Sequence, residues 1–209
     1  MATHTAKVFA DIDISLDGFV AGEHISKSDP LGKGGEHLIW YGDDVNDDNA
    51  DFASAYDSVD AEVLEESSAR EGAVIMGRNT FDISIEEWGE TPPIHKPCFV
   101  LTHRPTQTIS KDGGTTFTFV SDLRAALEQA QEAAAGRDVG VMGGAETIRQ
   151  YLAEGLLDEL HLHVAPVLLG GGTRLFDNIT PGSVHLEKLR VRDGAKATHL
   201  LYQCSKQPG

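Results

Sequence analysis

The chain has 209 residues, of which 40% are hydrophobic and 22 are glycines, and its formal net charge is −16. This length lets one domain bury a full core, so we expect a single domain over residues 1–209. The negative charge argues against nucleic acid or an anionic membrane as a partner, because affinity for polyanions comes from Lys and Arg that neutralise phosphates. A phosphate-bearing small ligand would therefore need a local pocket.

The cysteine content and the N-terminus indicate the compartment. Cys98 and Cys204 are the two cysteines and do not form a CxxC pair, which argues against a disulfide framework and a thiolate zinc site. The N-terminus lacks an apolar signal core, and no apolar run is long enough to span a bilayer. We therefore expect a cytoplasmic protein.

The first predicted element is a strand over residues 7–15. Its apolar residues alternate with Asp11, Asp13 and Ser15, so one face is apolar and the other is acidic. Two interpretations of the acidic face stay open. Asp11 and Asp13 face solvent on an edge strand, or Asp13 lies at the floor of a ligand cleft.

Residues 23–57 form the least regular stretch. A Gly-rich loop at 32–35 is followed by Trp40 and by an acidic run over residues 43–49. The spacing of the acids does not match a calcium-binding loop, so we expect no metal site there. Long irregular segments in compact domains are often functional, which favours a substrate loop. The composition of residues 61–70 predicts a helix.

Three strand-to-turn units then follow along the chain. Each is a short apolar strand whose carboxyl end carries glycine, a hydroxyl group or arginine. Glycine allows close approach of a ligand, arginine supplies fixed positive charge, and the N-terminus of a following helix favours anions. Ligands of open α/β sheets bind at this edge. The three turns are Gly77-Arg78-Asn79-Thr80, Thr102-His103-Arg104 and Gly143-Gly144-Ala145-Glu146.

The rest of the chain alternates strands and helices. Residues 116–120 predict a strand, and Asp122 is a plausible cap for a helix that ends near Gly136. Alternation over residues 160–165 places His161 and His163 on one strand face, where we expect half-exposed histidines rather than metal ligands. Residues 184–192 and 198–204 predict a hairpin.

These motifs together resemble a known family. The chain is similar to the dihydrofolate reductase-like superfamily, and most closely to the C-terminal reductase domain of bacterial bifunctional riboflavin-biosynthesis proteins. No deaminase domain precedes this region, so we expect a bacterial stand-alone member. The motifs that carry the resemblance follow in family order and are residues 15–21, 76–81, 101–105, 142–145 and 165–172.

The resemblance implies a fold and a cofactor. The fold is an α/β, three-layer αβα arrangement around a central mixed, mostly parallel sheet of about eight strands, with residues 23–57 as an irregular insertion. NADPH is expected across the carboxyl ends of the strands, together with a cis peptide between Gly143 and Gly144. The cofactor-binding residues that the resemblance implies are Ile12, Val20, Ala21, Gly77, Arg78, Thr80, Thr102, His103, Arg104, Met142, Gly143, Gly144, Ala145 and Glu146.

The resemblance also implies a reaction. The chain resembles 5-amino-6-(5-phosphoribosylamino)uracil reductase of riboflavin biosynthesis, in which NADPH delivers a hydride to a ribosylamino group. Asp13 and Asp17 are the catalytic candidates, with Asp13 the nearest acid for the proton, and Trp40 faces the substrate. The insertion does not match the substrate-phosphate site of the riboflavin enzymes. Dihydrofolate reduction and a catalytically inactive NADP-binding protein therefore remain alternatives, and a homodimer is expected from the family.

Overall fold

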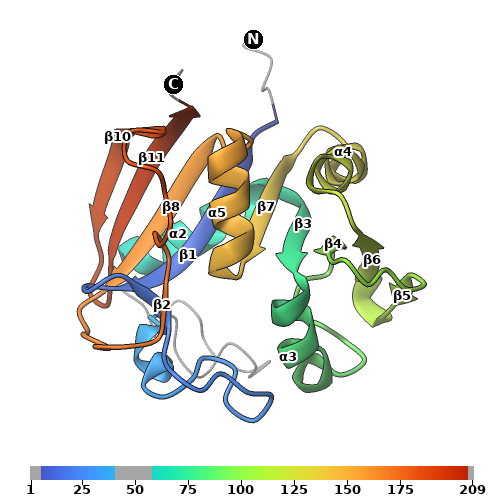
Figure 1. The fold of residues 1–209 in the computed structure, drawn as a ribbon, viewed down its shortest axis with the longest axis horizontal. Coiled ribbons are helices and arrows are strands. Elements are labelled where there is room, and N and C mark those ends of the chain that lie inside the picture. Colours follow the sequence, from blue (N-terminus) through green and yellow to red (C-terminus); the bar gives the residue numbers. More distant parts are fainter. Residues whose placement is uncertain (1–5, 41–57, 207–209) are drawn as a thin grey trace.

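The structure is a computed structural model that describes residues 6–40 and 58–206. Its main feature is a nine-stranded sheet with the order β10-β11-β8-β1-β7-β3-β4-β6-β5 (Figure 1). A separate two-stranded ribbon pairs β2 (Phe19–Ala21) with β9 (Thr173–Arg174). The strands of the main sheet are β1 (Val8–Ser15), β3 (Glu71–Gly77), β4 (Pro97–Leu101), β5 (Ile109–Ser110), β6 (Thr116–Val120), β7 (Asp138–Gly143), β8 (Glu159–Ala165), β10 (Val184–Asp193) and β11 (Thr198–Lys206).

The six strands from β8 to β6 in this order run parallel to one another, whereas β5, β10 and β11 pair antiparallel. The mixed, mostly parallel sheet is therefore confirmed, with nine strands where the resemblance implied about eight. Because parallel strands share a direction, the carboxyl ends of β1, β3, β4 and β7 meet at one edge of the sheet. The expected cofactor turns follow three of these strands.

Four α-helices and two short 3-10 helices accompany the sheet in the described residues. The α-helices are α2 (Ser58–Arg70), α3 (Arg78–Trp88), α4 (Leu123–Ala134) and α5 (Ala145–Glu154), and the 3-10 helices are η1 (Gly35–Leu38) and η3 (Asp112–Gly114). None of the helices in the described ranges is long and apolar enough to cross a membrane.

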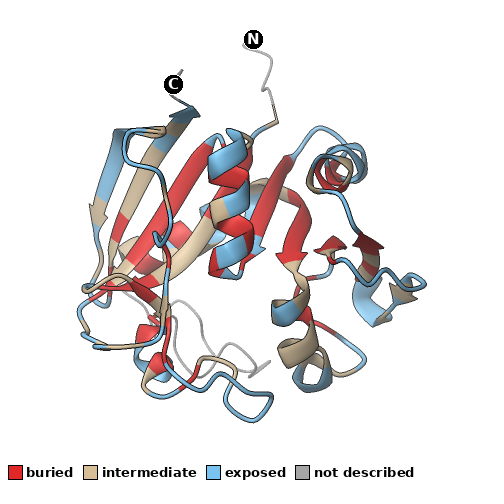
Figure 2. Ribbon diagram, in the orientation of Figure 1, coloured by how far each residue is buried: buried red, intermediate tan, exposed pale blue. Residues whose placement is uncertain are grey.

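Strand β3 shows why the sheet is covered on both faces. Val74, Ile75 and Met76 are all fully buried, as the continuous apolar run predicts. Ile75 packs into the cluster under α4 and α5, whereas Val74 and Met76 pack into a second cluster with Phe81 of α3. Helices thus lie on both sides of the sheet, and the three-layer arrangement is confirmed (Figure 2).

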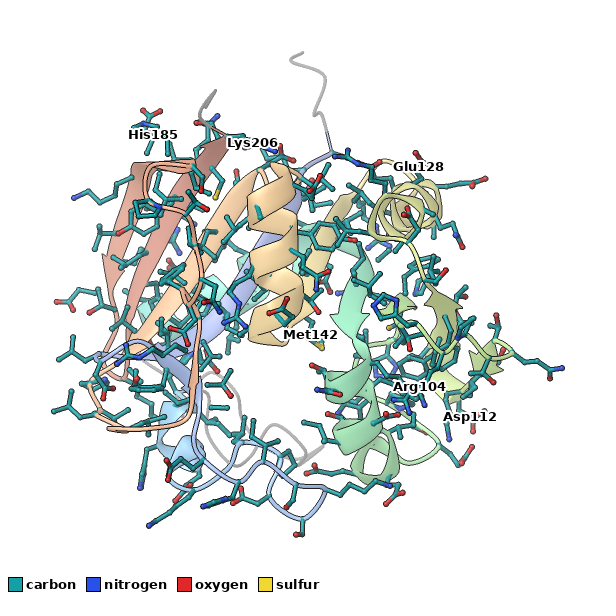
Figure 3. The ribbon with its side chains drawn as sticks, in the orientation of Figure 1. Arg104, Asp112, Glu128, Met142, His185 and Lys206 are labelled. Carbon is teal, nitrogen blue, oxygen red and sulfur yellow. The ribbon has the colours of Figure 1, made fainter. Side chains whose placement is uncertain are left out.

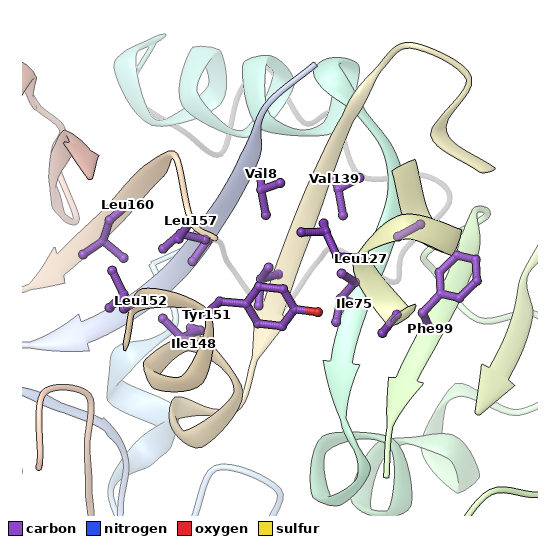
Figure 4. Packing of buried hydrophobic residues seen from close by; sticks show 14 of the residues in the cluster. Val8, Ile75, Phe99, Leu127, Val139, Ile148, Tyr151, Leu152, Leu157 and Leu160 are labelled. Atoms are coloured by element: carbon purple, nitrogen blue, oxygen red, sulfur yellow. The ribbon is translucent and has the colours of Figure 1, made fainter. Parts of the chain in front are cut away.

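The larger core lies between the sheet and helices α4 and α5 (Figure 4). The carboxylate of Asp122 accepts a hydrogen bond from the Ala125 N–H at 2.8 Å, so the predicted helix cap is confirmed. Tyr151 of α5 is completely buried and donates its hydroxyl to the Leu123 carbonyl at 3.0 Å, which ties α5 to α4. Side chains from six strands, β1, β3, β4, β6, β7 and β8, and from both helices therefore form one continuous apolar layer.

The opposite face of β1, β8 and β11, beneath α2, is polar. Strand β1 pairs with β8 on one side and β7 on the other, so it is a central strand. The edge-strand interpretation of Asp11 and Asp13 is therefore wrong. His161 and His163 are 7% and 3% exposed, so the expectation of half-exposed histidines is also wrong, because α2 covers this face of β8.

Two other expectations concern the irregular segment between β2 and α2 and the hairpin near the C-terminus. Residues 23–40 contain turns, isolated bridges and η1, in agreement with an irregular segment. Residues 41–57, with the acidic run that includes Asp43, Asp44 and Asp47, lie outside the described residues. Strands β10 and β11 form the predicted antiparallel hairpin.

Candidate functional site

The carboxyl edge of the sheet brings the three predicted turns together. In the register of the sheet, Met76 of β3 lies opposite Gly143 of β7, and Gly77 lies opposite Leu101 of β4. The turns at 77–80, 102–104 and 143–146 are thus neighbours in space although they are far apart in the sequence. Met142 and Arg104 both lie toward the end of the sheet where β3 enters α3 (Figure 3).

The glycines at this edge have different structural roles. A Cβ at Gly77 would lie 2.6 Å from Thr147 Oγ1, so glycine is needed there for the close approach of β3 and α5. Gly143 has a φ of 117°, in the region that favours glycine, and its peptide bond to Gly144 is cis, as expected. Gly144 is exposed, and a Cβ there would meet Thr80 Oγ1 only at 3.6 Å. Its backbone is therefore open to a ligand beside the Thr80 hydroxyl.

Two helices begin at this edge. α3 starts immediately after Gly77 and α5 immediately after Gly144, so both N-cap residues are glycines. The first N–H groups of a helix have no partner within the helix and carry partial positive charge, which favours phosphate. Near the start of α5, the pKa of Glu146 is lowered by hydrogen bonds from Arg149 and Gln150. Arg149 lies 2.7 Å from the Glu146 carboxylate and offsets its charge.

Arginines surround the turn that follows β4. Arg78 Nε donates to Asp82 at 2.7 Å, and Arg78 Nη1 donates to the Arg104 carbonyl at 3.3 Å. The Arg104 side chain is 76% exposed, and its guanidinium lies 3.9 Å from Asp82. The neighbouring His103 is also exposed. Arg104 and His103 are therefore available to an anionic ligand, with Arg78 held beside them.

Thr102 has a different place from the one expected. Its side chain is only 6% exposed, and its Oγ1 accepts the Arg104 N–H at 3.1 Å. Its own N–H donates to the Val120 carbonyl at 2.9 Å. Thr102 therefore shapes the turn that presents His103 and Arg104, and its side chain is buried.

The predicted nicotinamide side is formed by β1 and β2. Ile12 lies beside the β7 turn, because a Cβ at Gly143 would be 3.7 Å from Ile12 Cδ1. Val20 is half-buried against the main core, and Ala21 is buried. These apolar side chains come from the two elements on which the resemblance placed the nicotinamide ring.

Asp13 and Trp40 form one unit in this part of the molecule. Trp40 Nε1 donates to Asp13 Oδ1 at 2.6 Å. Trp40 is only 2% exposed, and its ring packs against the rings of His163 and His199 with centroid separations of 4.9 and 4.7 Å. Trp40 thus lies behind Asp13 and positions it, rather than offering a surface to the substrate.

Asp17 belongs to a loop contact. Its carboxylate accepts hydrogen bonds from Ser15 Oγ at 2.7 Å and from the N–H groups of Leu169 and Gly170 at 3.1 and 2.8 Å. The Ser15 hydrogen bond, with those from the backbone of Gly170 and Leu169, lowers the pKa of Asp17 to about 2 against the effect of burial. A carboxyl group held ionised in this way is a poor proton donor, so the geometry does not support the catalytic role expected for Asp17.

The sequence did not reveal a buried polar chain beneath α2. His163 Nε2 lies 2.6 Å from Asp11 Oδ1, the Nδ1 atoms of His163 and His199 lie 2.8 Å apart, and His199 Nε2 lies 2.8 Å from Asp60 Oδ1. The alternation of acids in β1 and of histidines in β8 was a signal for part of it, once the two strands are placed side by side. Over the described ranges, no group of three or more His, Cys, Asp or Glu side chains is arranged to hold a metal.

The geometry of this edge indicates the structural class of the protein, and the family follows from a comparison with known proteins. The class is an α/β protein with a mixed sheet whose parallel strands end in glycine-rich and arginine-bearing turns, two of which open helices, at the edge where ligands of open α/β sheets bind. The family model of the RibD C-terminal domain matches residues 6–200. The chain belongs to this family, which has the dihydrofolate reductase-like reductase fold.

Individual relatives agree with this assignment. The uncharacterised protein YwjB of Bacillus subtilis is 27% identical over 175 residues, which cover 81% of this chain and 82% of YwjB. A solved structure from Shewanella sp. PV-4, named for riboflavin biosynthesis, matches with a TM-score of 0.67 and 23% identity over 96% of this chain and 99% of its own. A pyrimidine reductase-like protein from Corynebacterium diphtheriae matches with a TM-score of 0.61 and 16% identity over 98% and 94%. At these identities the two structures show the shared fold alone.

Proposed function

We propose that the protein is an NADPH-dependent reductase that acts on a small heterocyclic or ribosylamino substrate. The observation that carries the proposal is the convergence of three anion-compatible turns at one sheet edge, at residues 77–80, 102–104 and 143–146. Membership of the RibD C-terminal domain family supports the same class of reaction.

The residues at this edge fit NADPH. The exposed backbone of Gly144 and the start of α5 suit the pyrophosphate, with Thr80 beside them. Arg104 and His103 suit the 2′-phosphate, because a guanidinium can bind a phosphate through two parallel hydrogen bonds. When bound, the cofactor supplies a hydride. The apolar side chains of Ile12 and Val20 then keep water from the reacting end.

The reaction also needs a proton. Reduction of a ribosylamino group at C1 to a ribityl chain breaks the C1–O4′ bond of the ribose ring, adds a hydride to C1 and adds a proton to O4′, while the nitrogen keeps its own hydrogen. Asp13 is the acid that the structure holds at the end of β1, fixed by Trp40. We therefore assign proton delivery to Asp13. A pyrimidine that carries such a ribosylamino group, as in riboflavin biosynthesis, is the substrate that the family favours.

A melting experiment tests the cofactor assignment. NADPH should raise the melting temperature more than NADH does, because only NADPH carries the 2′-phosphate. Arg104→Ala should weaken NADPH binding by about tenfold to about a hundredfold and remove most of the difference, in line with roughly 1.5–3 kcal/mol for a hydrogen bond to a charged group. Arg137→Ala is the matched control, because Arg137 is an exposed arginine at the opposite edge, where it donates to the Glu71 carbonyl. Equal shifts with both cofactors in the wild type would refute the 2′-phosphate site.

Turnover assays separate the remaining alternatives. Oxidation of NADPH by a ribosylamino pyrimidine and not by dihydrofolate supports the proposed substrate class. Oxidation by dihydrofolate alone would reassign the enzyme as a dihydrofolate reductase. NADPH binding without turnover of either would indicate an inactive NADP-binding protein.

The assembly and the compartment are further parts of the proposal. Edge strand β10 exposes Leu186, Leu189 and Val191 to 38%, 46% and 49%, which supports a homodimer formed on this strand. Light scattering that gives the mass of one chain would refute it. Both cysteines are free thiols, which supports a cytoplasmic location.

A further inference from the structure

A chain of buried hydrogen bonds lies directly behind Trp40 and joins four side chains from four elements. Asp11 of β1, His163 of β8, His199 of β11 and Asp60 of α2 are linked by contacts of 2.6, 2.8 and 2.8 Å. His163, His199 and Asp60 are 3%, 5% and 0% exposed. This chain of groups is called here the histidine relay.

The contacts fix how many protons the histidine relay contains. An ionised carboxylate only accepts hydrogen bonds, so each Nε2 carries a proton toward its aspartate. If both imidazoles were neutral, the two Nδ1 atoms would be bare and would face each other at 2.8 Å with lone pairs opposed. One further proton between the Nδ1 atoms removes this repulsion. Three contacts therefore hold three protons, and the two imidazoles together carry one positive charge.

The charges around the pair agree with one shared proton. Burial opposes a charge on His163, but the nearby Asp11, with the charges of Asp13 and Asp60, outweighs it and raises the pKa of His163. Burial and the charge of His163 lower the pKa of His199 despite its hydrogen bond to Asp60. His163 thus binds the extra proton more firmly, and His199 accepts a hydrogen bond from it.

Other ionisable groups border the pair on each packed element. His161 and Glu159 lie on the same face of β8, and Arg70 of α2 contacts both of them. Arg192 of β10 lies opposite His199 in the register of the sheet and pairs with Glu66 and Glu62 of α2. Both arginines are paired with other carboxylates. Asp11 and Asp60 therefore balance the positive charge of the histidine pair.

Trp40 connects this pair to the site. Its ring packs on both imidazoles, and its Nε1 donates to Asp13. We propose that His163 and His199 share one extra proton and that this protonated pair is the positioning device that holds Trp40, and through it the Asp13 carboxylate, at the reacting end of the proposed cofactor site. The statement about the reacting end rests on the proposed reductase function, whereas the shared proton and the position of Trp40 do not.

Nuclear magnetic resonance of the ¹⁵N-labelled full chain tests the proposal without cofactor or substrate. At neutral pH, the ring nitrogens of His163 and His199 should show one positive charge between them and a proton shared at Nδ1. His163→Gln and His199→Gln assign the signals. Two neutral rings in the unmodified protein, each protonated only at Nε2, would overturn the proposal.

The indole N–H signal of Trp40 provides the positioning readout. Trp88→Phe identifies it, since the chain has two tryptophans. On raising the pH from about 6 to about 10, the Trp40 signal should move with the same midpoint as the histidine pair, above the ordinary histidine value of about 6.5. His199→Gln should remove this coupled change, and the exposed His185→Gln should keep it. A Trp40 signal that is the same in His199→Gln and in the parent would also overturn the proposal.

Turnover assays test the positioning role separately from the shared proton. In an active enzyme, His199→Gln should lower kcat by about tenfold to about a hundredfold, while the KM for NADPH and the melting shift with NADPH stay unchanged. Loss of the shared proton in the spectra with unaltered kcat at every pH would refute the positioning role. If the parent reduces no candidate substrate, the proposed function fails, but the spectra still decide the shared proton.

Discussion

The indole nitrogen of Trp40 lies 2.6 Å from a carboxylate oxygen of Asp13, and this contact joins the buried polar layer under α2 to the open edge of the sheet. Trp40 comes from the segment after β2, and Asp13 comes from the central strand β1. The ring is buried and cannot move without disturbing both histidines on which it packs. The orientation of Asp13 is therefore set from inside the protein.

Asp13→Asn should lower reductase turnover by roughly a hundredfold to roughly ten-thousandfold, which is the usual contribution of a general acid. Asparagine keeps the size of the side chain and an oxygen that accepts the Trp40 hydrogen bond. The rise in melting temperature with NADPH should therefore persist. Single-turnover oxidation of NADPH measures the first effect and a thermal shift the second. Unchanged turnover would show that another group delivers the proton.

Asp17→Asn should remove part of the acid sensitivity of the protein. The pKa of Asp17 is about 2 in the folded protein, below its ordinary 3.8, because Ser15 Oγ and the N–H groups of Gly170 and Leu169 donate to it. Its stabilising effect is complete above the ordinary value and is lost as the pH falls toward 2. Melting temperatures measured from pH 6 downward should fall less steeply in Asp17→Asn than in the wild type. The exposed Asp177→Asn should keep the wild-type slope.

Arg70→Ala should destabilise the fold by about 3–5 kcal/mol, because it removes the guanidinium that pairs with two buried carboxylates. Arg70 lies between Asp138, at 2.5 Å, and Glu159, at 2.8 Å, and these side chains are 0% and 5% exposed. Arg190→Ala is the control, since Arg190 and its partner Glu66 are 41% and 45% exposed, and it should cost at most about 1 kcal/mol. Urea unfolding measures both. Similar losses in the two variants would contradict a buried role for Arg70.

Gly77→Ala should destabilise the protein by about 1–3 kcal/mol through overpacking, because the new methyl group would lie 2.6 Å from Thr147 Oγ1. Thr147→Ala removes that oxygen and should restore much of the lost stability when the two changes are combined. A double-mutant cycle in urea therefore gives a favourable coupling between the two sites. Simple additivity would mean that Gly77 is required for another reason.

The sequence predicted the elements whose signal is local. Val74, Ile75 and Met76 are consecutive apolar residues, and only a strand covered on both faces buries such a run completely. The hairpin of β10 and β11 and the Asp122 cap likewise depend on residues that are close in the chain. The resemblance to a family then supplied the strand arrangement, which no local pattern contains.

The site could be predicted only in part, since its partners are far apart in the chain. Alternation placed Asp11 and Asp13 on one face of β1, but only the position of β1 between β7 and β8 shows that this face is covered. The sequence did not show that Asp17 is held in a loop contact. Its carboxylate accepts from the N–H groups of Leu169 and Gly170, which lie 152 and 153 positions further along the chain. His163 and His199 meet across β8 and β11 although 36 positions separate them.

The polar face beneath α2 has a consequence for how the protein opens. Helices α4 and α5 are attached by a large apolar core, whereas α2 is attached by Asp60, Ser67 and Arg70 and by a small apolar cluster that includes Val63. Protonation of carboxylates weakens the attachments of α2 and leaves the apolar core intact. The pKa of Asp11 is lowered to about 2, so this loss takes place as the pH falls from the ordinary carboxyl pKa of 3.8 toward 2. Over that range, amide hydrogens of α2 should exchange with solvent well before those of α4 and α5, because one face of the sheet loses its helix while the other stays folded.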